Sequence, residues 1–185
     1  MDGEFYILNY IQDQLRTDFL DKLMPAISFL GKAGLIWIVI ALLCLFFKRS
    51  RLLGRSLVFN LIFNLVASSL IIKPIVSRLR PCVLDSTVEL LVKLPFDTSF
   101  PSGHTLFAFG AATIIFIYNK WLGTAAYIFG FLMAFSRLYL YVHFPTDVAF
   151  GAVFGVIFAV IAYKMEGMIF DRTKPLFVIR NRHKT

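Results

Sequence analysis

The chain has 185 residues, of which 58% are hydrophobic and only 16% are charged, and its mean hydropathy is +0.75. These values exclude an ordinary soluble domain, in which about a quarter of the residues are charged, and predict an all-α integral membrane protein. The formal net charge of +8 comes from short basic tracts beside apolar segments. This pattern indicates membrane topology and excludes a nucleic-acid partner.

Residues 1–30 are expected to form amphipathic helices at the membrane interface. Within residues 4–15, apolar side chains recur on one face at helical spacing: Tyr6 or Ile7, Tyr10 or Ile11, and Leu15. This segment is too short and too polar to span the bilayer. Residues 19–30, interrupted by Pro25, are expected to enter the bilayer without crossing it. The acidic start is the reverse of a signal peptide, so no cleavage is expected.

Residues 31–165 are predicted to form a polytopic transmembrane helix bundle. The expected five spans are residues 35–47, 57–72, 104–118, 121–141 and 145–163. The first is short for a span, so its helix either extends back through Gly34 towards Leu30 or tilts little. Six spans is the alternative if residues 1–30 also cross. Asn60 and Asn64, one turn apart, favour interhelical hydrogen bonds over a site. Gly151 and Gly155 have a spacing that lets helices approach closely.

Basic residues in short loops set the expected orientation. The 48–55 turn has four of them, the 119–120 turn has one, and six more follow the last span: Lys164, Arg172, Lys174, Arg180, Arg182 and Lys184. Five spans place all of these on one side, so residues 166–185 are predicted to be a basic cytoplasmic tail. Three polar clusters then share the extracytoplasmic face of the membrane. The small size of the protein favours a bacterial plasma membrane.

The first polar cluster lies just beyond the second predicted span. It runs from Lys73 to Pro81 and contains Arg78 and Arg80. Arginine forks and lysine point charges commonly hold phosphate oxygens. Basic residues at span ends also anchor helices at lipid headgroups, and for this cluster alone the anchor is the favoured interpretation.

The second polar cluster is Pro101-Ser102-Gly103-His104, immediately before a predicted helix. Proline, serine and glycine at a helix start leave backbone N–H groups free at the positive end of the helix dipole, which suits an anion. His104 can donate or accept a proton there. The alternative is an ordinary helix start with an interfacial histidine.

The third polar cluster contains Arg137, His143 and Asp147. Pro145 opens a helix and places Asp147 in its first turn, so this carboxylate can orient the imidazole of His143 for nucleophilic attack. Stabilisation of the helix N-terminus by Asp147 is the alternative, worth under about 1 kcal/mol, but it leaves the other two residues unexplained. With no cluster of acidic metal ligands, the three clusters together predict phosphoryl transfer without a metal.

These clusters resemble the three signature motifs of the type 2 phosphatidic acid phosphatase superfamily in residue type, order and spacing. The matching patterns are Lys73, six residues and Arg80-Pro81; Pro101 to His104; and Ser136-Arg137, five residues, His143, three residues and Asp147. The resemblance covers about residues 35–165. It implies that His143 forms a phosphohistidine, that Asp147 orients it and that His104 protonates the leaving oxygen and then activates water.

The same resemblance implies the groups that hold the phosphate and the class of substrate. The phosphate-binding residues would be Lys73, Arg80, Ser102, Gly103 and Arg137, with no metal or other cofactor. Arg78, outside the motifs, is our candidate for a contact with a headgroup or diphosphate. The expected substrate is a membrane lipid phosphate or diphosphate: undecaprenyl diphosphate, phosphatidylglycerophosphate or phosphatidate.

Two alternatives to a phosphatase remain open at this stage. A phosphotransferase would use the same phosphohistidine but pass the phosphoryl group to an acceptor other than water. A non-catalytic transporter or lipid-binding subunit would use the basic pocket only to hold headgroups, but binding alone does not require His104, His143 and Asp147 together. The sequence sets no oligomeric state.

Overall fold

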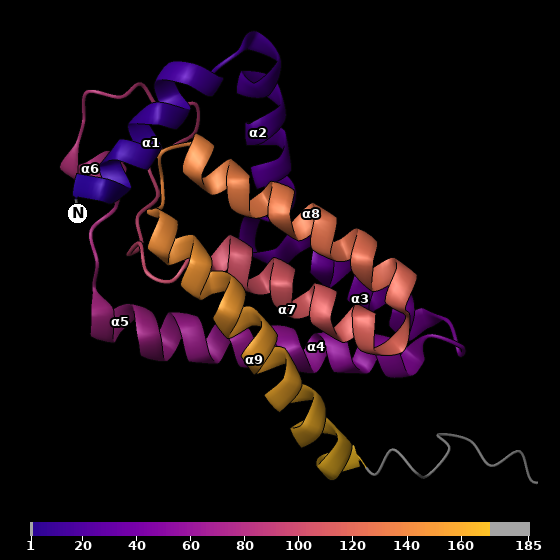
Figure 1. The fold of residues 1–185 in the computed structure, drawn as a ribbon. Helices are drawn as coiled ribbons and strands as arrows, with labels where there is room; N and C mark the ends of the chain where they lie inside the picture. The colour runs from indigo at the N-terminus through magenta and orange to yellow at the C-terminus, as the bar shows by residue number, and fades with distance from the viewer. Residues whose placement is uncertain (1, 171–185) are drawn as a thin grey trace, which may run out of the picture.

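The computed structural model of the chain describes residues 2–170, which form helices joined by turns and loops, with no strand in this range. Figure 1 shows the helices arranged as an elongated bundle. At one end lie α1 (Asp2–Leu15), α6 (Pro81–Leu84) and the connection from α8 (Lys120–Tyr139) to α9 (Pro145–Phe170). The turns that join α3 to α4 and α7 to α8 lie at the opposite end.

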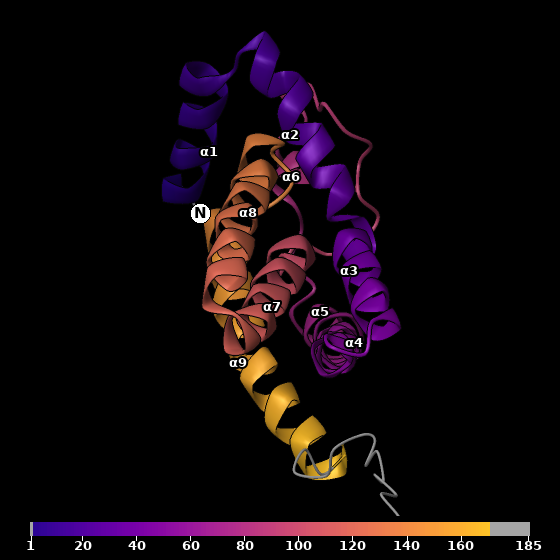
Figure 2. The ribbon, with the colours of Figure 1, turned by 90° about the vertical axis from the view of Figure 1, so that its right-hand side faces the viewer.

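The first helix packs against α8 and α9 (Figure 2). A helix was expected here and is present, but of the residues expected on its apolar face only Ile11 is buried. Leu8 and Ile11 are buried, whereas Tyr6 and Tyr10 are 73% and 54% exposed. The sequence spacing allowed several faces, and contact with α8 and α9 selects the one that carries Leu8.

The second helix is connected to the third across a sharp bend. α2 (Asp18–Leu30) and α3 (Leu35–Phe46) are bent by 45° around the short helix η1 (Lys32–Gly34). The alternative of a continuous helix through Gly34 is therefore wrong. Ala33 and Gly34 have φ angles of 52° and 73°, in the left-handed region that interrupts an α-helix.

The next helical segment is longer than predicted because it begins at Arg51. α4 (Arg51–Leu65) continues into the π-helical η2 (Val66–Ile72) and then into α5 (Lys73–Val76), which ends at Ser77 with φ of 46°. This left-handed residue turns the chain away from the helix and carries it towards α6.

The two asparagines of α4 are buried against Gly110 of α7. Asn64 Nδ2 donates to Asn60 Oδ1 at 3.3 Å, within the same helix. The remaining amide atoms, Asn60 Nδ2 and Asn64 Oδ1, have no hydrogen-bond partner among residues 2–170. The predicted interhelical hydrogen bonds are thus wrong, since these side chains pair with each other and pack against a glycine.

The helices α7 (Gly103–Tyr118) and α9 pack closely against each other along much of their length. A Cβ atom on Gly151 would lie 2.8 Å from the carbonyl oxygen of Ser102, and one on Gly155 would lie 2.6 Å from that of Leu106. Only glycine fits at such distances. This confirms the prediction that Gly151 and Gly155 allow close helix approach, and it brings the start of α7 to the start of α9.

Three segments in the described range are long and apolar enough to cross a membrane: Arg51–Leu84, Lys120–Tyr139 and Pro145–Phe170. The bent pair of α2 and α3 gives a fourth if it forms one broken span, and α7 is a shorter apolar helix of 16 residues. The all-α membrane bundle is confirmed, but the count of five spans is not. The predicted tail begins inside α9, and residues 171–185 lie outside the described range.

Candidate active site

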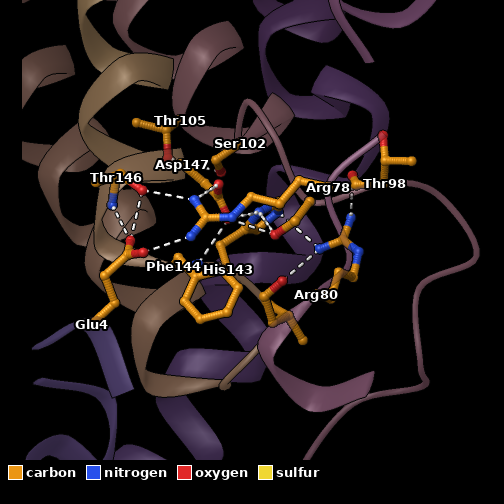
Figure 3. A network of polar contacts seen from close by, with 12 residues as sticks. Glu4, Arg78, Arg80, Thr98, Ser102, Thr105, His143, Phe144, Thr146 and Asp147 are labelled. Atoms are coloured by element: carbon orange, nitrogen blue, oxygen red, sulfur yellow. Dashed lines mark hydrogen bonds and ion pairs between the residues drawn. The ribbon is translucent and has the colours of Figure 1, made fainter. Parts of the chain in front are cut away.

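The three polar clusters meet at the end of the bundle where α8 connects to α9 (Figures 1 and 3). Lys73 starts α5, Arg80 precedes α6, and Ser102 precedes α7. Arg137 lies in the last turn of α8, and Asp147 lies in the first turn of α9. Each of these five residues is at most 8% exposed, so the fold buries four charged residues and a serine at one place.

His143 lies in the turn between α8 and α9, next to Asp147. Its Nδ1 atom is 3.6 Å from Asp147 Oδ2, which is within ion-pair range but too long for a good hydrogen bond. The same carboxylate oxygen accepts from the backbone N–H of Phe144 at 2.8 Å and from the hydroxyl of Ser99. Ser99 Oγ is also 3.4 Å from His143 Nδ1 and therefore lies beside the pair.

The contacts of His143 define its tautomer. Arg80 Nη1 lies 3.0 Å from His143 Nε2, and because a guanidinium can only donate, Nε2 must accept. The proton of the neutral imidazole then lies on Nδ1, the nitrogen that faces Asp147. Burial, followed by the neighbouring charge of Arg80, lowers the pKa of His143 well below its usual value. The imidazole is therefore neutral at neutral pH, with its lone pair on Nε2.

Two cations of the first cluster, Lys73 and Arg80, are held by Asp97, a residue that the motifs do not include. Its carboxylate accepts from Lys73 Nζ and from Arg80 Nη2, both at 2.7 Å. Burial opposes ionisation of Asp97, but Lys73 and Arg80 outweigh this effect and keep its pKa below the usual range. Lys73, Asp97 and Thr98 line a cavity of about 310 Å³.

Arg137 differs from the other cations of the site because no carboxylate among residues 2–170 forms an ion pair with it. The side chain is 4% exposed, and in the described part of the chain no carboxylate lies within ion-pair distance of it. Its Nη1 donates to Ser28 Oγ, while its buried Nε has no hydrogen-bond partner among residues 2–170. A buried guanidinium with an unused donor is suited to bind an anion.

His104 shares a neighbour with Arg137, since its ring contacts the backbone of Ser28. It is also close enough to His143 and Arg80 to interact with them electrostatically. The C-terminal part of α2 thus touches both the candidate acid and a candidate phosphate ligand. A Cβ atom on Gly31, in the same region, would lie 2.9 Å from the His104 ring.

The start of α7 has fewer free backbone N–H groups than the sequence suggested. The N–H of Ser102 donates to the carbonyl oxygen of Asp147 at 3.0 Å, and its hydroxyl accepts from Thr105 at 3.1 Å. Gly103, in contrast, borders open space, because no side-chain or non-local atom lies within 4 Å of the position that a Cβ would take. Gly103 is therefore the more accessible of the two at this helix start.

Sequence reasoning missed Ser28, Asp97 and Ser99. The last two lie in the polar run Asp97-Thr98-Ser99, one residue before the Pro101 to His104 motif, which was a usable signal. Ser28 is a single hydroxyl in an apolar helix, 109 residues from Arg137, and nothing local identifies it. In the described range there is no group of three or more histidine, cysteine or acidic side chains that could hold a metal ion, and both cysteines are free.

Comparison with known proteins places this arrangement in a family. The PAP2 superfamily model matches residues 53–171. An undecaprenyl-diphosphatase from Sulfolobus acidocaldarius is 33% identical over 163 residues, covering 88% of this chain and 76% of that protein. A bacitracin transport permease protein BcrC from Bacillus licheniformis is 29% identical over 143 residues, covering 76% of this chain and 70% of that protein.

Two crystal structures share the fold. LpxE from Aquifex aeolicus aligns with a TM-score of 0.76 at 28% identity, covering 87% of this chain and 94% of that one. A PAP2-type phosphatidylglycerolphosphate phosphatase from Bacillus subtilis aligns with a TM-score of 0.72 at 25% identity, covering 91% and 86%. The family model covers the three clusters and most of the helices that position them, and we conclude that the chain belongs to the PAP2 superfamily.

Proposed function

We propose that this protein is an integral membrane phosphatase that hydrolyses a lipid phosphate or diphosphate through a phosphohistidine on His143. The observation that carries the proposal is the 3.0 Å contact between His143 Nε2 and Arg80 Nη1. It joins a neutral nucleophile to a guanidinium that can hold a phosphate. The transmembrane domain over residues 31–165 supplies these groups, and Arg137 offers a further donor for the anion.

In the first step, phosphate oxygens take over donors of Arg80, Lys73 and Arg137, which releases His143 Nε2 from Arg80. Nε2 then attacks the terminal phosphorus, an Nε2–P bond forms and the bond from this phosphorus to the leaving oxygen breaks. The leaving oxygen is the bridging oxygen of a lipid diphosphate or the ester oxygen of a lipid monophosphate. His104 donates a proton to the departing oxygen. Asp147 and Ser99 hold the Nδ1–H side of the ring and stabilise the positive charge that develops there.

In the second step, His104 accepts a proton from water, and the water oxygen attacks phosphorus. The Nε2–P bond breaks, phosphate leaves and His143 returns to its neutral form. The fixed side-chain cations and the open backbone at Gly103 stabilise charge on the phosphate oxygens in both transition states. Ser102 supports this site through its hydrogen bond to Asp147.

We propose a lipid diphosphate, undecaprenyl diphosphate, as the first substrate to test. This choice is supported by the 33% identity to an undecaprenyl-diphosphatase, whereas the structural neighbours include a phosphatidylglycerolphosphate phosphatase. The site lies at one end of the bundle, as expected for a headgroup at a membrane surface. We assign that surface to the extracytoplasmic face of the plasma membrane, from the distribution of basic residues.

The test is phosphate release by the purified protein in detergent with EDTA present. Undecaprenyl diphosphate, phosphatidylglycerophosphate and phosphatidate are compared side by side, with His143→Ala as the control. We expect release from at least one lipid without metal and none from the variant. Release only after magnesium is added, or an active His143→Ala protein, would contradict the proposal.

A further inference from the structure

Arg78 is not one of the motif residues, yet it is in direct contact with Asp147, one of the candidate catalytic residues (Figure 3). Its Nη1 atom donates to Asp147 Oδ1 at 2.8 Å and to Thr146 Oγ1 at 2.7 Å. Its guanidinium carbon lies 4.1 Å from the centre of the Phe144 ring. The guanidinium therefore contacts three residues that immediately follow His143 or begin α9.

The second nitrogen of Arg78 connects this contact to the N-terminal helix. Nη2 donates to Glu4 Oε2 at 2.5 Å, across 74 residues of sequence. The other oxygen of Glu4 accepts from the backbone N–H and the hydroxyl of Thr146, at 3.2 and 2.6 Å. Figure 3 shows Glu4, Arg78 and Asp147 as a continuous chain of polar contacts that leads from α1 to α9.

Other contacts of α1 hold the same turn. The ring of Phe5 packs edge-on against Phe144 with 5.3 Å between centroids, and the hydroxyl of Tyr141 donates to Asn9 at 2.8 Å. Tyr141 has a φ of 58°, an unusual value for a residue with a side chain, directly before Val142 and His143. One helix thus supports both sides of the turn that carries the nucleophile.

We propose that Glu4 and Arg78 are positioning residues for the phosphatase reaction, so that α1 completes the catalytic site. Asp147 is fully buried, and within residues 2–170 Arg78 provides the hydrogen bond to its Oδ1 atom. Held at Oδ1, the carboxylate keeps Oδ2 directed towards Phe144 N–H, Ser99 and His143. Glu4 in turn fixes the position of the Arg78 guanidinium. The inference rests on the proposed function and replaces the expectation that Arg78 binds a headgroup.

The test separates kcat from KM in detergent for Glu4→Gln, Arg78→Gln and Arg78→Lys. Partners that orient a catalytic group typically contribute about 10- to 100-fold. We expect kcat to fall about 10-fold in Glu4→Gln and about 100-fold in Arg78→Gln, with little change in KM. Arg78→Lys keeps the charge, but one ammonium cannot hold both carboxylates in the same geometry, so its kcat should also fall at least about 10-fold.

A double variant tests whether Glu4 acts through Arg78. Combining Glu4→Gln with Arg78→Gln should give no larger loss than Arg78→Gln alone, because both changes remove the same contact to Asp147. Exchanging the charges, with Glu4→Arg and Arg78→Glu together, should not restore activity, since it places a second carboxylate beside Asp147. Restored activity would show a simple structural ion pair and overturn the inference.

Arg16→Gln is the matched control, because it breaks an ion pair of the same N-terminal region with similar exposure. The Arg16 and Asp21 side chains are 29% and 27% exposed, against 23% and 20% for Arg78 and Glu4. The thermal midpoint of each variant in detergent identifies losses caused by unfolding. The inference would be overturned if the Glu4→Gln and Arg16→Gln variants had the same kcat. It would also be overturned if substitution of Arg78 changed KM by different factors for a lipid monophosphate and a lipid diphosphate.

The result also distinguishes this inference from the proposed function. If the wild type is active, His143→Ala is inactive and Glu4→Gln is normal, then only the positioning role is wrong. If His143→Ala is as active as the wild type, the proposed function is wrong and the positioning role is overturned with it.

Discussion

The two ends of α9 each bury a carboxylate, but they do so in different ways. Asp147 in the first turn and Glu166 near the C-terminal end are both fully buried. Glu166 pairs with Arg55 and accepts from Ser56, which ties the end of α9 to the start of α4. Asp147 pairs with Arg78 but also lies beside a histidine that contacts a second arginine.

The difference shows what distinguishes a site from a structural ion pair. At Glu166, the Arg55 guanidinium is matched by a carboxylate and lies 4.7 Å from the centre of the Phe170 ring. Around Asp147, the charges of Arg78, Arg80 and Lys73 are also matched, by Glu4, Asp97 and Asp147. Arg137 adds a cation with an unused donor, so the Asp147 end is suited to bind an additional anion.

The largest expected effect is that of removing His143, the proposed nucleophile. His143→Ala should lower kcat by at least about 1,000-fold, because no other group replaces a covalent nucleophile. Initial rates of phosphate release, normalised to protein that elutes as a folded species in detergent, measure the effect. A loss below 10-fold would mean that the residues around Asp147 do not form the catalytic site and only stabilise the fold, as those around Glu166 do.

The next effect concerns the unmatched cation. Arg137→Lys keeps the charge but loses the planar fork, and we expect kcat/KM to fall about 100-fold. Steady-state kinetics on one lipid measure it, with Arg55→Lys as the matched control at the other end of the bundle. Equal behaviour of the two lysine variants would remove the distinction between the two ends.

A smaller effect should appear in the pH dependence of stability. Because burial lowers the pKa of His143, the unfolded chain binds this proton more readily than the folded chain does below about pH 6.5. The stability that His143 contributes in its neutral form is therefore lost as the pH falls from about 6.5 towards the lower folded pKa. The thermal midpoint of the wild type should fall more steeply over this window than that of His143→Gln, and parallel curves would contradict it.

The smallest effect on catalysis is expected for the structural pair. Arg55→Gln removes the charge-assisted hydrogen bond from Arg55 to the buried Glu166, which should destabilise the protein by on the order of 2 kcal/mol. The rate per folded molecule should stay within about 2-fold of the wild type. Thermal unfolding and kinetics on the same preparation measure both quantities. A large loss of kcat at full stability would show that the far end of α9 also serves the reaction.

The sequence predicted the helical class, the membrane character and the three clusters that the fold brings together, because these depend on local composition and on short motifs. It did not predict the contacts of Glu4 with Arg78 or of Ser28 with Arg137, which join residues 74 and 109 positions apart. Such pairs follow from tertiary packing and have no local pattern. The bend at Ala33 was missed although a local signal was present, since Gly31 and Gly34 lie beside it and glycine disfavours a continuous helix.

The most direct test of the central claim is rapid-quench analysis with a lipid whose terminal phosphate is labelled with ³²P. Label bound to the protein and phosphate released are measured in the same samples for the wild type and for His143→Gln. We predict an acid-labile, alkali-stable label on His143 in the wild type, with both label and release lost in the variant. Release by His143→Gln at the wild-type rate, or label on another residue, would contradict the account.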